Sequence, residues 1–159
     1  LGISGGTQAI LSYNYGAKRA DRVKDAERNI LKLMLIFTTL MFLLSRLIPR
    51  YFVLLFTSDP QYISFSVWAI HTYTLMIIPL SFQYVFVDGL TALECPKTGL
   101  ALSVTRKSLF VLSAIILPVF FGAKAAFFAE PVADGISSVL STIVFLLLIS
   151  RHLEKRCSI

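Results

Sequence analysis

One acidic residue inside a long apolar segment is the position best suited to chemistry. Asp88 falls in the apolar segment 62–93, one to two helical turns before its end. Ionisable groups in such surroundings are costly, and by default they indicate a function. Gln83, Tyr84 and Asp88 form a polar stripe at helical spacing that also includes Thr91. If this stripe faces a cavity, the carboxylate would exchange a proton or bind a cation there.

Other polar residues have a structural alternative beside a functional one. Asp88 itself could reach the membrane interface, or pair with Arg106 across a short polar turn; for Arg106 we favour a carboxylate partner or a lipid headgroup. Asp134 lies at the expected start of the last apolar segment, where an acid suits the helix dipole. Gln8 and Asn14 would either line a cavity or hydrogen-bond neighbouring helices, and the second use is commoner in membranes.

The elements that position these residues must lie in a membrane. Hydrophobic residues make up 56 % of the 159 residues and charged residues only 15 %, with a mean hydropathy of +0.75. Soluble domains are usually about half apolar and about a quarter charged, and so small a domain could not hide this much apolar surface from water. The net charge of +6 lies beside the ends of apolar runs, not on one basic face, which argues against a nucleic-acid partner.

Hydropathy predicts one all-α membrane domain over residues 1–159. A helix needs about 20 mostly apolar residues to cross a hydrocarbon core of ~30 Å. Four segments meet this length and a fifth, at the N-terminus, is shorter. Pro79 predicts a kink in the long third segment, and the chain is expected to be the C-terminal piece of a longer protein. The expected helices cover about 1–15, 30–48, 62–93, 100–121 and 132–150.

The distribution of basic residues predicts the orientation. If the helices alternate in direction, three of the fifteen basic residues fall on one side (Arg46, Arg50 and Lys124). The positive-inside rule then makes the other side cytoplasmic, together with the C-terminus. The cytoplasmic group comprises Lys18, Arg19, Arg22, Lys24, Arg28, Lys32, Lys97, Arg106, Lys107, Arg151, Lys155 and Arg156.

Five short motifs, in this order and spacing, resemble one transporter family. Gln8 with Tyr13-Asn-Tyr-Gly-Ala17 is similar to the end of the second helix in the C-terminal lobe of multidrug and toxic compound extrusion (MATE) proteins, where Gly16 lets the chain leave the helix before a basic loop. Ala9 departs from the Pro common in the family, and Gly5 from a second Gln. The other matching segments are Phe56-Thr-Ser-Asp-Pro60, Glu94-Cys-Pro-Lys97, Ser103-Val-Thr-Arg106, and Gly122 with Pro131-Val-Ala-Asp134.

The resemblance implies the fold and the function. It implies a polytopic helical bundle that is the C-terminal part of a twelve-helix, two-lobe transporter in the cell membrane, with the N-terminal lobe as its partner. Drugs or lipophilic cations would leave in exchange for sodium ions or protons, with no cofactor. The candidates to line the cavity for substrate or ion are Gln8, Asn14, Gln83, Tyr84 and Asp88, and Arg106 is the candidate for a structural ion pair.

Two other functions remain open at this point. A lipid-linked precursor flippase shares a related two-lobe plan, but it should carry many Arg or Lys residues for phosphates, and only Arg106 and Lys107 come near this. A structural or interaction membrane protein that forms oligomers is the alternative from another class. An enzyme is the least favoured, because no nucleotide-binding loop, metal-ligand cluster or catalytic triad is recognisable.

Overall fold

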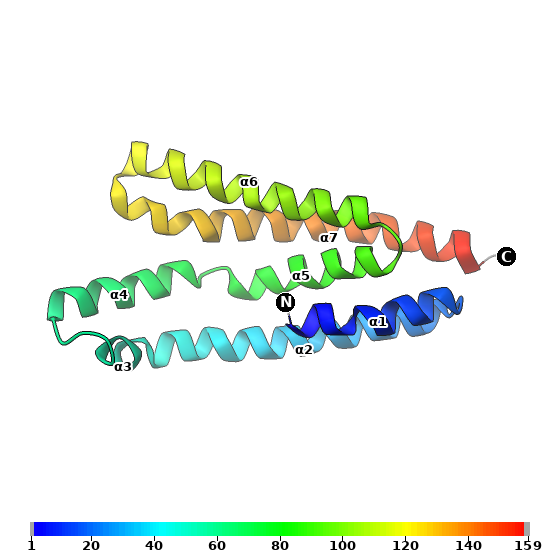
Figure 1. Ribbon diagram of the computed structural model, residues 1–159, viewed down its shortest axis with the longest axis horizontal. Helices are drawn as coiled ribbons and strands as arrows, with labels where there is room; N and C mark the ends of the chain where they lie inside the picture. Colours follow the sequence, from blue (N-terminus) through cyan, green and yellow to red (C-terminus); the bar gives the residue numbers. More distant parts are fainter. Residues whose placement is uncertain (1, 158–159) are drawn as a thin grey trace.

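The protein is a bundle of long helices in the computed structural model, which describes the backbone of residues 2–157 and the side chains of residues 2–149. Figure 1 shows the helices running along the long axis, with connections at both ends. No strand occurs in residues 2–157. The elements are α1 (Gly2–Gly16), α2 (Ala20–Leu47), α3 (Pro49–Leu54), α4 (Pro60–Tyr73), α5 (Ile77–Ala92), α6 (Pro96–Phe121), the 3-10 helix η1 (Ala123–Phe128) and α7 (Ala129–Cys157).

The helices have the length and composition of membrane spans. Helices α2, α6 and the η1–α7 unit are each long and apolar enough to cross a bilayer. Helices α4 and α5 reach that length together, with a bend of 43° between them. The all-α polytopic membrane fold expected from the sequence is therefore confirmed.

The predicted single helix over 62–93 is broken in two. We expected a kink at Pro79, but the chain leaves the helix at 74–76, and Pro79 lies in the first turn of α5. Proline has no N–H, and its ring would clash with the carbonyl of Leu75 in a continuous helix. The break therefore falls just before the proline, where α4 ends.

Four helices begin earlier than predicted. Helix α2 begins at Ala20 instead of residue 30, α4 at Pro60 instead of 62, α6 at Pro96 instead of 100, and α7 at Ala129 instead of 132. The prediction followed apolar content, whereas the helices also include charged residues before each apolar run, such as the exposed Lys97 of α6 and the ion-paired Glu130 of α7. In the first turns of α2, Val23 and Glu27 are buried while the charged residues between them are exposed.

The turn between α1 and α2 does not use Gly16 as expected. Gly16 is the last residue of α1, but the left-handed conformation belongs to Lys18, with φ 58°. The backbone N–H of Arg19 donates to the carbonyl of Asn14 at 3.0 Å and closes this turn. The chain thus reverses within three residues, which sets α1 against the first half of α2.

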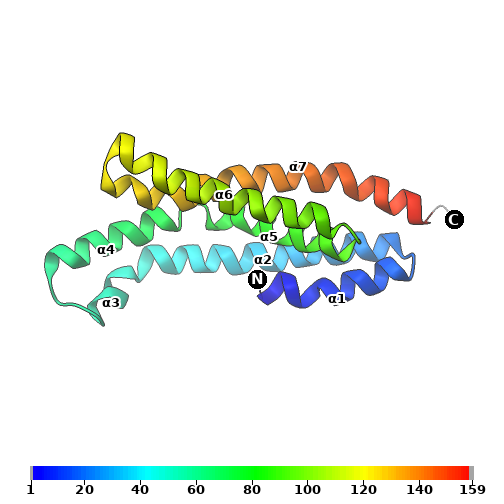
Figure 2. The ribbon, with the colours of Figure 1, turned by 45° about the horizontal axis from the view of Figure 1, so that its top comes forward.

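Helix α5 is the centre of the bundle. Figures 1 and 2 show it between α2 on one side and α6 and α7 on the other, with α1 alongside. Val85, Phe86 and Leu90 of α5 are buried in the core, and the Phe86 ring stacks on Phe145 of α7 with centroids 4.5 Å apart. Leu11 of α1 completes the core on the other side.

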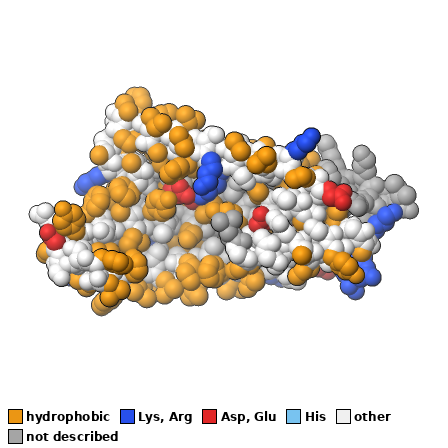
Figure 3. Space-filling model, viewed as in Figure 1, with side chains coloured by type: hydrophobic (Ala, Val, Ile, Leu, Met, Phe, Trp, Pro, Cys, Tyr) orange, Lys and Arg blue, Asp and Glu red, His pale blue; other side chains and the backbone are white. Residues whose placement is uncertain are grey.

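The outer surface of the bundle is apolar, as lipid contact requires. Leu47, Leu55, Phe120 and Phe121 are each more than 70 % exposed. Figure 3 shows hydrophobic side chains over much of one face, with charged side chains concentrated toward one end and in a small group near the middle. Such a surface would be insoluble in water but is matched to a bilayer.

Close contact between α5 and α6 requires glycine at position 99. A Cβ on Gly99 would lie 2.8 Å from Thr91 Oγ1 and 3.2 Å from the backbone oxygen of Val87. We expect Gly99→Ala to lower the free energy of unfolding by about 1–3 kcal/mol, because the backbone oxygen cannot move away. A thermal melt of the purified protein in detergent measures this. Gly135→Ala is the control, since its Cβ would meet Met76 at an ordinary 3.8 Å; equal melting temperatures of the two variants would contradict the prediction.

Candidate functional site

Asp88 is held in the interior by a helix from the other side of the core. The side-chain amide of Gln8 on α1 donates to Asp88 Oδ1 at 3.0 Å. Both residues are half-buried. Two of the residues expected to line a cavity are thus in direct contact, although they lie eighty positions apart in the chain.

A second carboxylate, Glu27, lies beside Asp88 and was missed in the sequence. Glu27 of α2 is only 6 % exposed, and it interacts electrostatically with Asp88. Its Oε1 packs against Gly89, where a Cβ would come within 2.6 Å of it. The signal was present in the sequence: Val23, Glu27 and Ile30 repeat at helical spacing on the buried face of α2.

The two carboxylates keep unused acceptor atoms. In the described part of the chain, Glu27 Oε1 and Asp88 Oδ2 are buried and have no hydrogen-bond partner. Buried polar atoms without partners are rare and need an explanation. Carboxylate and amide oxygens are the ligands that hard cations prefer, so the cluster Gln8–Glu27–Asp88 can hold a small cation or a proton.

The carboxylate cluster lies near one end of the bundle. Gln8, Glu27 and Asp88 are about 12, 10 and 6 Å along their helices from the α1–α2 and α5–α6 connections, at ~1.5 Å per residue. These connections carry the basic residues that predict the cytoplasmic side.

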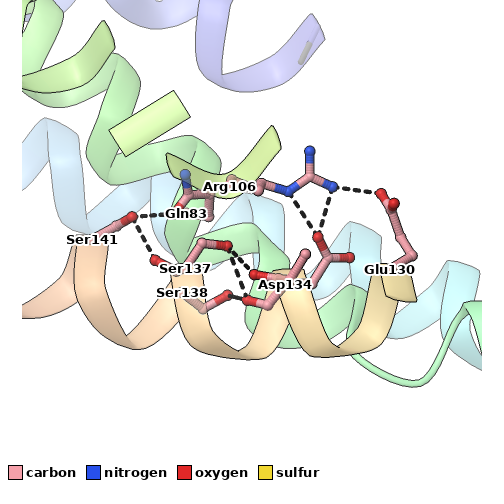
Figure 4. Close-up of polar contacts among 8 residues, drawn as sticks. Gln83, Arg106, Glu130, Asp134, Ser137, Ser138 and Ser141 are labelled. Carbon is pink, nitrogen blue, oxygen red and sulfur yellow. Dashed lines mark hydrogen bonds and ion pairs between the residues drawn. The ribbon is translucent and has the colours of Figure 1, made fainter. Parts of the chain in front are cut away.

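A separate ionic cluster joins α6 to α7. Arg106 Nε donates to Asp134 Oδ1 at 2.8 Å, and Arg106 Nη2 donates to Glu130 Oε1 at 2.7 Å (Figure 4). The side chains of Arg106 and Asp134 are 9 % and 4 % exposed, and that of Glu130 is 17 % exposed. The alternative in which Arg106 pairs with Asp88 is wrong in this structure, because both acids that hold Arg106 come from α7.

The positions of Arg106 and Asp134 along their helices correct two expectations about this cluster. Arg106 lies about 15 Å along α6 from Pro96, about half of a ~30 Å hydrocarbon core. It therefore lies near the middle of this helix rather than at the end where Lys97 lies, and the same holds for Lys107. Asp134 lies beyond the first turn of α7, which begins at Ala129, so it serves as the partner of Arg106 rather than as a helix cap.

Polar side chains also join α5 to α7, further along α7 than the ion pairs. Ser141 donates to the Gln83 side-chain oxygen, and its hydroxyl also lies 2.7 Å from the carbonyl of Ser137 (Figure 4). Gln83 is 2 % exposed. The side chain of Gln83 is thus committed to helix association, the commoner use of amides in membranes.

The other two candidates differ in placement. Tyr84 is half-buried, and its ring faces the guanidinium of Arg106, with the carbon of that group 5.7 Å from the ring centroid. Asn14 donates to the carbonyl of Ile10 in its own helix at 2.8 Å. The structure thus brings Gln8 and Asp88 together and sets Tyr84 beside Arg106, whereas Asn14 lies apart from both clusters.

Fold and polar clusters together define a class of protein. The chain is a polytopic helical membrane bundle that holds ionisable groups within its spans, and such groups mark ion and substrate pathways in transport proteins. Comparison with known proteins gives the particular family. The model of the MatE family matches residues 1–119, and the chain belongs to this family of membrane transporters.

Two known proteins illustrate the relationship. A FAD transporter of Shewanella oneidensis is 25 % identical over 135 residues, which are 84 % of this chain and 30 % of that protein. A solved structure, the inward-facing conformation of a multidrug resistance MATE family transporter, covers 98 % of this chain with a TM-score of 0.87 at 16 % identity. This chain spans 36 % of that transporter, so it matches about a third of the length of either protein.

The ion pairs make a prediction about stability. We expect Asp134→Asn to lower the free energy of unfolding by about 3 kcal/mol, because it leaves the buried Arg106 short of one opposite charge. Glu130→Gln should cost about 1 kcal/mol or less, the scale of one hydrogen bond, since Asp134 Oδ1 contacts both Nε and Nη2 of Arg106 and keeps its charge paired. Thermal melts of both variants in detergent measure the difference. A larger loss for Glu130→Gln than for Asp134→Asn would contradict the assignment of Asp134 as the main partner.

Proposed function

We propose that the chain is part of a secondary transporter that exports small organic molecules in exchange for entering sodium ions or protons. The observation that carries this proposal is the carboxylate cluster Gln8–Glu27–Asp88, with two buried oxygens that have no partner among the described residues. Two neighbouring carboxylates bind a cation when one can reach them. Without a bound cation, their like charges repel each other. Ion binding can therefore be linked to a change in helix packing.

The physical link is charge repulsion between two helices. Glu27 on α2 and Asp88 on α5 interact electrostatically inside the bundle, where Glu27 packs against the neighbouring Gly89. Like charges repel more strongly there than in water. A bound cation or proton removes this repulsion and favours close packing of α2 against α5. Since a ligand shifts an equilibrium only by its different affinity for the two states, an ion bound here favours the conformation in which the two helices are closed.

The cargo has two candidate classes. The family resemblance implies drugs or lipophilic cations, for which the apolar and aromatic side chains of the spans offer suitable contacts. The relative that transports FAD adds a second candidate, a molecule with a diphosphate and aromatic rings. A lipid-linked precursor is less well supported, because only Arg106 and Lys107 supply positive charge near the middle of the spans.

The carboxylate cluster is tested by transport measurements on the full-length protein that carries this sequence. In proteoliposomes, with ethidium as the lipophilic cation and FAD as the anionic probe, we expect Asp88→Asn to reduce gradient-driven transport at least tenfold. We expect Glu27→Gln to reduce gradient-driven transport by a smaller factor, because this variant keeps the carboxylate of Asp88 and its hydrogen bond with Gln8. Sodium and proton gradients applied separately identify the coupling ion.

A matched variant controls for loss of charge on α2. Asp25 is exposed and lies two positions before Glu27 in the same helix. Asp25→Asn should leave gradient-driven transport unchanged. Full transport by both Asp88→Asn and Glu27→Gln, at equal protein level, would exclude the cluster as the coupling site.

Transport should also need more than this chain. Alternating access in two-lobe transporters depends on one lobe moving against the other around a shared site, and the chain covers about a third of each matched protein. We expect cells that express residues 1–159 alone to show no gain in resistance to toxic cations. Resistance equal to that given by the full-length protein would contradict the two-lobe proposal.

A further inference from the structure

A small pocket opens between α5 and α6 beside the Arg106 ion pairs. Its volume is about 230 Å³. The lining contains two cationic side chains and no acidic one: Gln83, Tyr84, Val87, Ser103, Arg106 and Lys107. This composition is unusual at a depth where a membrane span is otherwise apolar.

Arg106 uses only part of its guanidinium in the ion pairs. Nε and Nη2 are bound by Asp134 and Glu130. Figure 4 shows the remaining nitrogen directed away from both carboxylates. The two acids thus hold Arg106 from one side, while a donor edge of the same group stays available on the other side.

Lys107 adds a charge that the described residues do not neutralise. It is exposed on α6, and no carboxylate in the described part of the chain lies within 4.0 Å of it. Asp134, the acid with which it interacts electrostatically, is already ion-paired with Arg106. An ammonium in the middle of a span is costly without a partner, and such positions mark substrate pathways.

Tyr84 connects this pocket with an apolar one. The second pocket has a volume of about 370 Å³ and is lined by residues of α1, α2 and α5, among them Met34, Phe37, Leu80 and Tyr84. A molecule lying over Tyr84 would place an apolar part against these side chains. It would then direct a polar group toward Arg106 and Lys107.

We infer that the pocket between α5 and α6 binds the phosphate or carboxylate group of an amphipathic organic anion, with Lys107 as the principal charge partner. Ser103 and the free edge of Arg106 supply further hydrogen-bond donors. Hydrogen bonds between a cationic donor and an anionic acceptor are stronger than those between neutral groups. The inference rests on the proposed function, because the bound molecule is taken to be the exported substrate. The inference predicts that the transported molecule is an anion rather than a cation.

The depth of the pocket argues for a soluble substrate over a lipid headgroup. Lys107 lies about 16 Å along α6 from Pro96, which is close to the middle of this 26-residue helix. Phosphate groups of lipids lie at the surface, about half a bilayer thickness away. An anion that reaches Lys107 would therefore travel within the transporter.

Equilibrium binding to the full-length protein tests the inference without any ion gradient. Riboflavin 5′-phosphate and riboflavin share one aromatic ring system and differ by a phosphate, and the flavin fluorescence reports binding to protein in phosphatidylcholine nanodiscs. We expect the phosphate form to bind more tightly. Lys107→Gln should weaken binding of the phosphate form about tenfold, through the loss of one charge-assisted hydrogen bond. The same variant should change riboflavin binding less than twofold. Lys107→Arg should retain tight binding of the phosphate form.

The control and the lipid comparison complete the experiment. Lys97→Gln removes the same charge from an exposed position in the same helix, and it should change neither affinity. Failure of the wild type to bind either probe, or equal loss of both probes in Lys107→Gln, would overturn the inference. So would competition by phosphatidylglycerol that disappears in Lys107→Gln, since a lipid headgroup would then be the occupant. Because binding needs no gradient, these results are independent of whether Asp88 couples transport to ions.

Discussion

The ion pairs of Arg106 with Asp134 and Glu130 are the interaction on which the arrangement of the bundle depends. In the hydrocarbon core no water can satisfy a polar group, so a charge there must find its partner on a neighbouring helix. Arg106 and its two acids fix the register of α6 against α7. The hydrogen bond from Ser141 to Gln83 extends the same register to α5, which in turn holds Asp88 against Gln8 and Glu27.

The two polar clusters have different balances of charge, and this separates their roles. Around Arg106 both acids have a cationic partner, which favours a fixed contact between α6 and α7, while the third guanidinium nitrogen stays directed away from them. Around Asp88 there are two carboxylates and one amide, with acceptor oxygens left over in the described structure. A polar network is rigid when all its hydrogen-bond donors and acceptors have partners, whereas unpaired donors or acceptors leave room for a ligand. The bundle thus combines a permanent joint between α6 and α7 with an incomplete one among α1, α2 and α5.

The membrane fold and the family could be predicted from the sequence, because hydropathy and turn motifs are local signals. The depth of Arg106 could not, because apolar content places the start of α6 too late and so makes this residue look superficial. Glu27 was missed for a similar reason: it falls in a basic segment taken for a loop, and only helical spacing with Val23 and Ile30 assigns it to a buried face. Asp88 could be selected as a candidate, but its partners lie on helices far away in the chain, which no local pattern specifies.

The break between α4 and α5 gives this span two mechanically separate halves. A continuous helix transmits rotation and translation along its whole length through its hydrogen-bond ladder, but residues 74–76 interrupt that ladder. The α4 half has aromatic contacts with η1, including Phe65 and Trp68 against Phe127, whereas the α5 half carries Asp88. Movement of α4 together with η1 at one end of the bundle can therefore leave the carboxylate cluster near the other end undisturbed.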